Sequence, residues 1–421
     1  MRLGVAKRDI TPWGSVPLAG FASRNGKGFD GIDKRLYVRT FYFERRTETN
    51  AVEKALLAIA DILFWDSRRV KALQRMIHRT WGIPEEAIIL HATHTHSGPS
   101  VSYRTIHIGD PVPEYVSFLE TETLASVEAA IACAEPVTIE RGVGSCDIGV
   151  NRRVKIGDAI EIGLNESGIR DQELTVVRFA VEGTNRTKAL LTHYACHPTV
   201  TNANRVSSEF IGVAMDLLEE QEGGVSGYLQ GCCGDINPAV RSDLDTVDSL
   251  GRRLADSVRL TLRSGLESVG PAAIRYRRVY VDLPFDRLPA PEQLRDMLTS
   301  AQPPEIRAWA ERLLDEPDAL SPSIPLELGR VDIADGLALL SMSGEMVVEY
   351  GLFIKQLSGN KIIPVAYSNG MSGYVTTAKQ REEGGYEPIG STLYFGLPAP
   401  FRHDAERMVL HSLSDLIDGQ H

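Results

Sequence analysis

The sequence predicts an α/β protein in which mixed sheets are layered with helices, and three observations lead to that prediction. Segments of alternating or apolar β-branched residues are followed by segments with apolar residues at helical spacing, and this order recurs along the chain. Several apolar runs stop at a proline or a Gly-Pro pair, as buried strands do where they enter loops. The composition, with 43% hydrophobic and 24% charged residues, is that of a globular protein.

The expected elements follow one another as strand, helix and strand. Alternating residues at 36–44 and 51–61 predict two strands joined by a polar hairpin loop. The segment 67–80 has apolar residues at helical spacing, with Ser67 available as its N-cap. Further strands are expected at 88–90, 138–150, 173–181, 188–197, 225–230, 276–283, 336–342 and 362–367, and further helices at 114–134, 209–220, 246–263, 345–357 and 403–417.

The chain of 421 residues is expected to form a single domain, residues 1–421, that carries one insertion. Prolines become frequent between residues 288 and 325, where they punctuate two short polar helices. A charged, proline-rich segment of this kind is typical of a surface insertion or a lid rather than of a linker between domains. We therefore expect a helical insertion or lid at about 288–325.

Charge and hydropathy narrow the range of partners. The net charge of −11 argues against nucleic acid, and no apolar run approaches the roughly 20 residues that span a bilayer, so stable membrane insertion is not expected. The N-terminal residues lack the apolar stretch of a signal peptide, and the five cysteines form no paired framework, which together favour the cytoplasm. The expected partner is a small molecule.

The segment 88–99, Ile-Ile-Leu-His-Ala-Thr-His-Thr-His-Ser-Gly-Pro, points most clearly to chemistry. An apolar run delivers three histidines and then stops at a Gly-Pro pair. Because side chains alternate along a strand, His94 and His96 should project together while His91 points elsewhere. Two imidazoles at a strand end form half of a metal site, although a lone histidine is more often a hydrogen-bonded structural residue.

Two later segments repeat this arrangement of an apolar strand that ends in a polar side chain. One ends with His197, directly before a proline that stops the strand. His193 shares the face of His197 but lies deeper in the strand, where a packed, hydrogen-bonded role is expected. The other strand turns through Gly344 into a helix with Glu345 in its first turn, where the helix dipole alone favours a carboxylate.

Seven short motifs lie along the chain in a fixed order. They are Ala-Thr-His-Thr-His-Ser-Gly-Pro at 92–99, Asn-Arg at 151–152, His-Pro-Thr at 197–199, Gly-Asp-Ile-Asn-Pro at 234–238, Ser-Gly-Glu at 343–345, Gly-Tyr-Val-Thr-Thr at 373–377 and Tyr-Glu at 386–387. Together they resemble the neutral ceramidase family of zinc-dependent amidohydrolases, whose catalytic domain they cover to about residue 400. The resemblance implies a mixed-sheet, layered α/β domain that cleaves an N-acyl amide or ester with a metal-activated water.

The resemblance also implies a site. Imidazoles, a carboxylate and a phenolate oxygen are acceptable zinc ligands, and zinc lowers the pKa of a bound water to about 7 while it polarises a carbonyl. Glu345 is the candidate to hold the proton of that water, and His96 or Tyr386 is the candidate donor to the oxyanion. The implied zinc ligands are His94, His197, Glu345 and Tyr374, and the implied residues of the reaction centre are His96, Arg152 and Tyr386.

The sequence departs from the family pattern in two respects. The family's Gly-Asp-x-Ser-Pro element has been proposed to carry a serine nucleophile, and this chain has Asn237 there. An amide is no nucleophile, so we favour the metal-activated water, for which all four expected ligands are present. The chain also ends without the C-terminal β-sandwich domain common in the family, and we expect a small, polar, soluble substrate, such as an N-acylated amino sugar or amino alcohol, with ceramide a poor substrate.

Two other classes of function remain open on the sequence alone. A serine hydrolase would use Ser97 or Ser100 with a nearby histidine, although neither serine lies in a Gly-x-Ser-x-Gly elbow. A catalytically inert protein that binds a sugar or a lipid on the same fold would keep the motifs without turnover. Inactivation by phenylmethylsulfonyl fluoride would indicate the first class, and metal content without hydrolysis would indicate the second.

Overall fold

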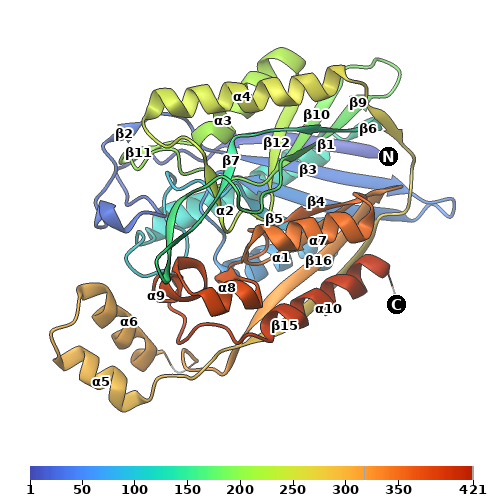
Figure 1. Cartoon of the computed structure of the whole chain (residues 1–421). Helices are drawn as coiled ribbons and strands as arrows, with labels where there is room; N and C mark the ends of the chain where they lie inside the picture. The colour runs from blue at the N-terminus through green and yellow to red at the C-terminus, as the bar shows by residue number, and fades with distance from the viewer. Residues whose placement is uncertain (317, 420–421) are drawn as a thin grey trace.

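The computed structural model describes residues 1–316 and 318–419, which form layers of helices around two sheets (Figure 1). In these residues the larger sheet has nine strands in the order β12-β10-β9-β6-β1-β3-β4-β5, with β14 beside β6. It is a mixed sheet, because β10 and β12, and also β4 and β5, are parallel. Its strands are β1 (Arg2–Asp9), β3 (Tyr37–Arg46), β4 (Val52–Ala60), β5 (Ile88–Ala92), β6 (Glu135–Ser145), β9 (Glu173–Val181), β10 (Thr187–Tyr194), β12 (Val225–Gln230) and β14 (Glu267–Val269).

A second sheet has the order β15-β16-β17-β19, in which β17 and β19 are parallel. Three smaller groups of strands lie in the connections: β13 with β7 and β8, β18 with β20, and β11 with β2. The strands are β15 (Arg275–Pro284), β16 (Ser323–Ala334), β17 (Leu337–Met342), β19 (Ile362–Val365), β7 (Gly149–Ile156), β8 (Ala159–Asn165), β13 (Ile236–Pro238), β18 (Glu345–Met346), β20 (Tyr374–Val375), β2 (Gly31–Ile32) and β11 (Arg205–Val206).

The two larger sheets pack face to face, and helices cover their outer faces. Leu191 of β10 shares a buried cluster with Leu339 of β17, whereas its neighbour Leu190 packs with the helices α3 and α4. Because successive side chains on a strand point to opposite faces, β10 is apolar on both sides and buried throughout. The main helices are α1 (Ser67–Trp81), α2 (Pro113–Ala132), α3 (Glu209–Glu222), α4 (Leu244–Arg263), α7 (Val348–Ser358) and α10 (Ala405–Asp418), and the shorter ones are η1 (Ala22–Arg24), η2 (Glu85–Ala87), α8 (Ala378–Glu383), η3 (Tyr386–Gly390) and α9 (Ser391–Tyr394).

The layered, mixed-sheet α/β architecture confirms the fold class, but three local expectations are wrong. The segment 138–150 is not one strand, because β6 ends at Ser145 and β7 starts a different sheet at Gly149. Helix α1 is capped by Asp66, whose Oδ1 accepts from the backbone N–H groups of residues 68 and 69 at 2.9 and 3.2 Å, so Ser67 is already helical. Helix α7 begins at Val348, so Glu345 lies before the helix, in β18.

Two helices do occur in the proline-rich segment, α5 (Pro291–Thr299) and α6 (Pro304–Asp315), and they project from the lower end of the molecule in Figure 1. This segment also ends in a strand that the sequence pattern did not predict, β16, which begins at Ser323 and pairs with β15 from Ser323 to Asp332. That residues 1–421 form a single domain stays a prediction, as does the role of the insertion as a lid. None of the helices in the described residues has the length and apolarity needed to cross a bilayer.

Candidate metal centre

His94 and His96 lie together, although the strand that was expected to carry them ends earlier. Strand β5 stops at Ala92, and His94 has a left-handed backbone with φ of 67°. The Nε2 atoms of the two rings are 3.2 Å apart, and their ring centroids are separated by 4.8 Å. His91 points elsewhere, as expected, because its Nε2 accepts from the backbone N–H of Gln230 at 2.9 Å. The turn after the strand, rather than strand alternation, brings the two histidines together.

His197 joins this pair from the loop after β10. Its ring centroid is 4.8 Å from that of His94, and the ring nitrogens of His94, His96 and His197 lie within 4.8 Å of one another. The backbone N–H of His197 donates to the carbonyl of Ile236 at 3.0 Å, which fixes the loop beside β13. His193 is buried within β10, outside this cluster. Its packed position agrees with the role expected for it, and the backbone of Pro364 is the hydrogen-bonding group that faces its ring.

Glu345 brings a carboxylate to the three imidazoles. Its Oε2 lies 3.4 Å from Nε2 of His94 and 3.4 Å from Nε2 of His197. The parallel pairing of β18 with β20 places Glu345 directly beside Tyr374. The hydroxyl of Tyr367 lies 3.5 Å from the same Oε2, and the Tyr367 ring stacks on His94 at 4.1 Å. Tyr367 therefore holds both a histidine and the carboxylate in position.

Backbone carbonyls set the tautomer of all three rings. Nδ1 of His94 lies 2.8 Å from the carbonyl of Leu63, Nδ1 of His96 lies 3.2 Å from that of Gly20, and Nδ1 of His197 lies 2.5 Å from that of Cys233. A carbonyl only accepts, so each Nδ1 carries the proton and each neutral ring turns the lone pair of Nε2 inward.

Three inward lone pairs and a carboxylate repel one another unless a cation lies between them. Nε2 of His197 is also buried without a hydrogen-bond partner in the described residues, as expected for a nitrogen that binds a metal. Hydrogen bonds from Nδ1 to backbone carbonyls are the usual support for metal-binding histidines. The donor set, imidazole nitrogens with one carboxylate, therefore fits zinc or a similar divalent ion.

Burial and charge keep these groups in the protonation states that a metal requires. Burial, helped by His94 and His197, lowers the pKa of His96 well below its ordinary value. Burial and the nearby Arg152 lower the pKa of His197 to about 4. Burial alone would raise the pKa of Glu345, but the facing imidazoles outweigh it and hold that pKa well below its usual range. These shifts favour neutral rings at His96 and His197 and an ionised carboxylate at Glu345.

Arg152 forms the second part of the site. Its Nε donates to Glu387 at 2.7 Å, its Nη2 to the hydroxyl of Tyr374 at 3.0 Å and its Nη1 to Oδ1 of Asn237 at 3.3 Å. Arg152 follows Asn151, which pairs with β13, and this pairing places Asn237 close to the guanidinium. Burial raises the pKa of Tyr374 well above its ordinary value although Arg152 opposes that shift. Asn237 thus acts as an acceptor for Arg152.

Tyr386 lies next to this arginine and marks the more open side of the site. Its ring is 5.7 Å from the Tyr374 ring, and the Arg152 guanidinium lies 5.7 Å from the Tyr386 ring centroid. His94, His197, Glu345 and Tyr374 are buried, whereas His96 and Tyr386 are partly exposed. A ligand would therefore approach past His96 and Tyr386.

Sequence reasoning missed three residues that support the site. Tyr367 and Glu387 hold Glu345 and Arg152 through contacts between segments far apart in the chain, and only the Tyr-Glu motif at 386–387 hinted at one of them. Arg24 is buried and donates to the carbonyls of His96 and Ala203 and to the hydroxyl of Ser97. Neither Ser97 nor Ser100 forms a hydrogen bond with a histidine in the described residues, which removes the geometric basis for a serine hydrolase.

The fold and the convergent donors define a candidate metal-binding α/β protein. A family profile described as neutral/alkaline non-lysosomal ceramidase, N-terminal, matches residues 1–248. The chain belongs to this family, as the motifs in the sequence suggested.

The relatives are distant. A neutral ceramidase of Pseudomonas aeruginosa is 25% identical over 332 residues, which are 72% of this chain and 47% of that protein. The chain thus spans about half the length of the curated relative that it matches. The crystal structure of neutral ceramidase from Pseudomonas aeruginosa has a TM-score of 0.74 at 19% identity, and a structure described as ceramidase complexed with C2 has a TM-score of 0.75 at 18% identity. Each match covers 99% of this chain and 74% of the other, which confirms the fold.

Proposed function

We propose that this protein is a zinc-dependent amidohydrolase that cleaves an N-acyl amide, or a related ester, with a metal-activated water. The observation that supports this most strongly is the convergence of three Nε2 atoms and the Glu345 carboxylate on one buried point. Membership of the ceramidase family supports amide hydrolysis as the reaction.

In this proposal His94, His197, Glu345 and Tyr374 hold the metal. When bound, zinc supplies Lewis acidity, which activates water and polarises a substrate carbonyl. Glu345 has one carboxylate oxygen directed at the histidines and accepts the proton of the attacking water. Arg152, His96 and Tyr386 surround the reacting carbonyl. Of the two expected donors, Tyr386 rather than His96 donates a hydrogen bond to the developing oxyanion, because Nε2 of His96 carries an inward lone pair.

The position of His96 favours a second assignment, in which His96 is itself a metal ligand. Its Nε2 lies with those of His94 and His197, and its Nδ1 is supported by a carbonyl in the same way. Metal content separates the two roles. If the His96→Gln variant keeps one zinc per chain but loses turnover, His96 acts on the substrate. If the variant also loses the metal, His96 is a ligand.

We propose a small, polar, water-soluble substrate, such as an N-acylated amino sugar or amino alcohol. The charged residues of the insertion helices and the polar side chains of His96 and Tyr386, which are partly exposed at the site, support this substrate class. One observation favours long-chain amides instead. The β7–β8 hairpin, which carries Arg152 and packs against the glycine before Tyr386, exposes about half of the side chains of Ile156, Ile162 and Leu164.

Two measurements test the proposed function. Elemental analysis of protein purified without chelator should find one zinc per chain, lost in His94→Ala and kept in the control His411→Ala, whose histidine is exposed on α10. Less than about a tenth of an equivalent of any transition metal would refute the centre. Release of free amine should be faster from soluble N-acyl amines than from detergent-solubilised long-chain ceramide. The opposite preference would move the substrate to the long-chain amides.

A further inference from the structure

A cavity of about 240 Å³ lies between the insertion helix α6 and the body of the protein, away from the histidines. It brings together arginines from three separate segments: Arg68 from the start of α1, Arg104 from the loop that follows the histidine motif, and Arg312 from α6. The two carboxylates in its lining are Glu316 and Asp318, so the arginines are in excess.

Arg104 is the least satisfied of these cations. Its guanidinium donates no hydrogen bond and forms no ion pair in the described residues, and the side chain is partly exposed. Burial, together with the like charge of Arg312, lowers its pKa, and the carboxylates of Asp66 and Glu316 oppose that shift. A guanidinium at a cavity that has no hydrogen-bonded partner of its own can bind an anion there.

Of the other two arginines, Arg312 is paired with the protein and Arg68 is not. Arg312 donates to the carbonyl of Tyr103 at 2.8 Å and pairs with Glu316 at 3.0 Å, which holds α6 against the loop that carries Arg104. Arg68 is exposed at the rim, and its guanidinium has no hydrogen bond or ion pair in the described part of the chain. The cavity therefore has two cations without a partner in the described residues, the partly buried Arg104 and the exposed Arg68.

The rest of the lining is mixed. Phe285, Ile324, Pro325 and Pro398 form apolar walls beside the arginines, and Ser67, Ser321 and Ser323 add hydroxyl groups. A ligand that matches both parts of the cavity would have a charged group to bind the guanidinium groups and an apolar group to contact these walls.

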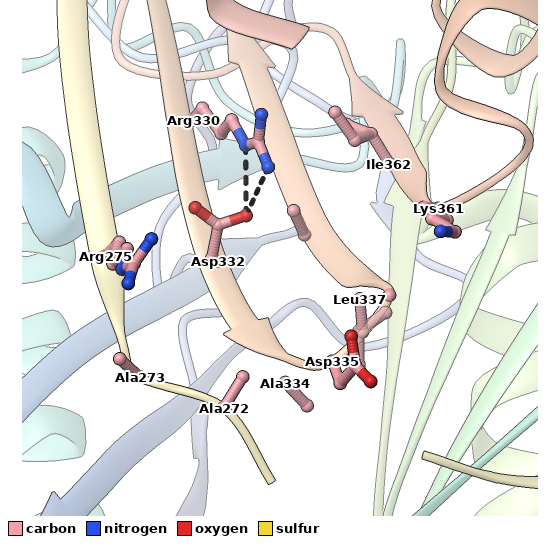
Figure 2. A pocket seen from close by; sticks show the side chains of 12 residues that line it. Ala272, Ala273, Arg275, Arg330, Asp332, Ala334, Asp335, Leu337, Lys361 and Ile362 are labelled. Carbon is pink, nitrogen blue, oxygen red and sulfur yellow. Dashed lines mark hydrogen bonds and ion pairs between the residues drawn. The ribbon is translucent and has the colours of Figure 1, made fainter. Parts of the chain in front are cut away.

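A larger cavity at the far edge of the second sheet provides a contrast (Figure 2). There Arg330 is already occupied, with hydrogen bonds of 2.7 and 3.0 Å to the same Asp332 oxygen and further bonds to the carbonyls of Leu416 and Ile417. Figure 2 shows the Arg330–Asp332 pair and the separate, exposed Arg275. The protein thus already satisfies Arg330, and the arginine of this cavity that has no partner in the described residues, Arg275, is exposed, whereas Arg104 in the other cavity is partly buried.

We propose that the cavity between α6 and the body binds a small organic anion, a carboxylate on an apolar body, whose charge is bound by Arg104. A planar guanidinium fork matches a carboxylate, and Arg68 adds charge at the entrance. The site is separate from the metal centre, because none of its lining residues belongs to the histidine cluster. The proposal therefore does not depend on the hydrolytic function.

The test is a binding titration of the full chain with three probes: benzoate, which has both parts, inorganic phosphate, which has only the charge, and benzyl alcohol, which has only the apolar body. Calorimetry should show benzoate binding at least tenfold tighter than either of the others. Arg104→Gln should weaken benzoate binding about tenfold or more, since it removes a charge-assisted contact, and Arg68→Gln should weaken it severalfold. Arg275→Gln, at the cavity of Figure 2, is the matched control and should bind as the unmodified protein does.

A second variant separates this site from the metal centre, which could also bind a carboxylate. His94→Ala should bind benzoate with unchanged affinity. The proposal fails if benzoate binding is lost in His94→Ala and retained in Arg104→Gln. It also fails if phosphate or benzyl alcohol binds as tightly as benzoate, or if Arg104→Gln and Arg275→Gln behave alike. The Arg104 guanidinium has no hydrogen bond or ion pair with the described residues, so the variant loses no such contact and should remain folded.

Discussion

Replacing Asn237 with alanine removes one of three hydrogen bonds that hold the Arg152 guanidinium. The bond to Asn237 is the longest, at 3.3 Å, whereas the bonds to Glu387 and Tyr374 measure 2.7 and 3.0 Å and remain in the variant. A hydrogen bond to a charged group contributes about 1.5 kcal/mol at the weak end of its range, so kcat/KM should fall about tenfold at most. Because Asn237 does not contact the histidines, the metal should stay bound.

The comparison is with Glu345→Gln, in which the charged oxygen between His94 and His197 is lost. That variant should lose most of its metal and all detectable turnover. Both are assayed for amine release and for zinc in the same preparation. Thr199→Val, which removes only a 3.5 Å contact to Asn237, is the control and should change kcat/KM less than about twofold. An Asn237→Ala protein that retains one zinc and is as inactive as Glu345→Gln would refute the assigned roles.

Three further predictions concern the support of the site. Arg24→Met should lower the free energy of unfolding by about 3 kcal/mol in denaturant titration, because the carbonyls of His96 and Ala203 lose their donor. Gly20→Ala should reduce zinc content and stability, since φ is 98° there and a Cβ would lie 2.5 Å from Nδ1 of His96. The control Gly26→Ala has φ of 65° but open space, so it should cost only about 1 kcal/mol. Burial raises the pKa of Glu209 from 4.5 to about 7, so the unfolded carboxyl ionises first and stability falls as pH rises between these values. Urea titrations across this range should show a fall of about 3 kcal/mol that is absent in Glu209→Gln.

The layered α/β fold could be predicted because its signal is local. β-Branched runs and helical spacing are properties of short segments, and most strands and helices begin and end within a few residues of their expected bounds. His94 and His197 could also be picked out singly, because each follows an apolar strand that stops at a loop. Their meeting could not, because β5 and β10 lie near opposite ends of the nine-strand order. The reason given for His94 and His96 was nevertheless wrong, because a turn with positive φ orients them.

The rest of the site depends on contacts that no local pattern encodes. Glu345 looked like the start of a helix, but its pairing with Tyr374 draws it into β18, and Asp235 accepts from the N–H of Val348 where the helix begins. Nothing in the sequence distinguishes Tyr367 from an ordinary core residue, and only the folded structure places its hydroxyl beside Glu345. Such roles come from tertiary packing, and family motifs rather than periodicity led to Tyr374 and Arg152.

Three of the proposed ligands, His94, His197 and Glu345, come from segments that are about a hundred or more residues apart, in the turns after β5 and β10 and in β18. Contacts between such distant parts of a chain close late in folding, because the loop entropy between them must first be overcome. We therefore expect the ion to bind after the chain has nearly folded and to have little effect on the folding rate. Chain refolded with chelator present should reach its native secondary structure at the usual rate, and zinc added afterwards should bind without a further folding phase. In a cell, assembly of the protein and supply of its metal would be separate events in time.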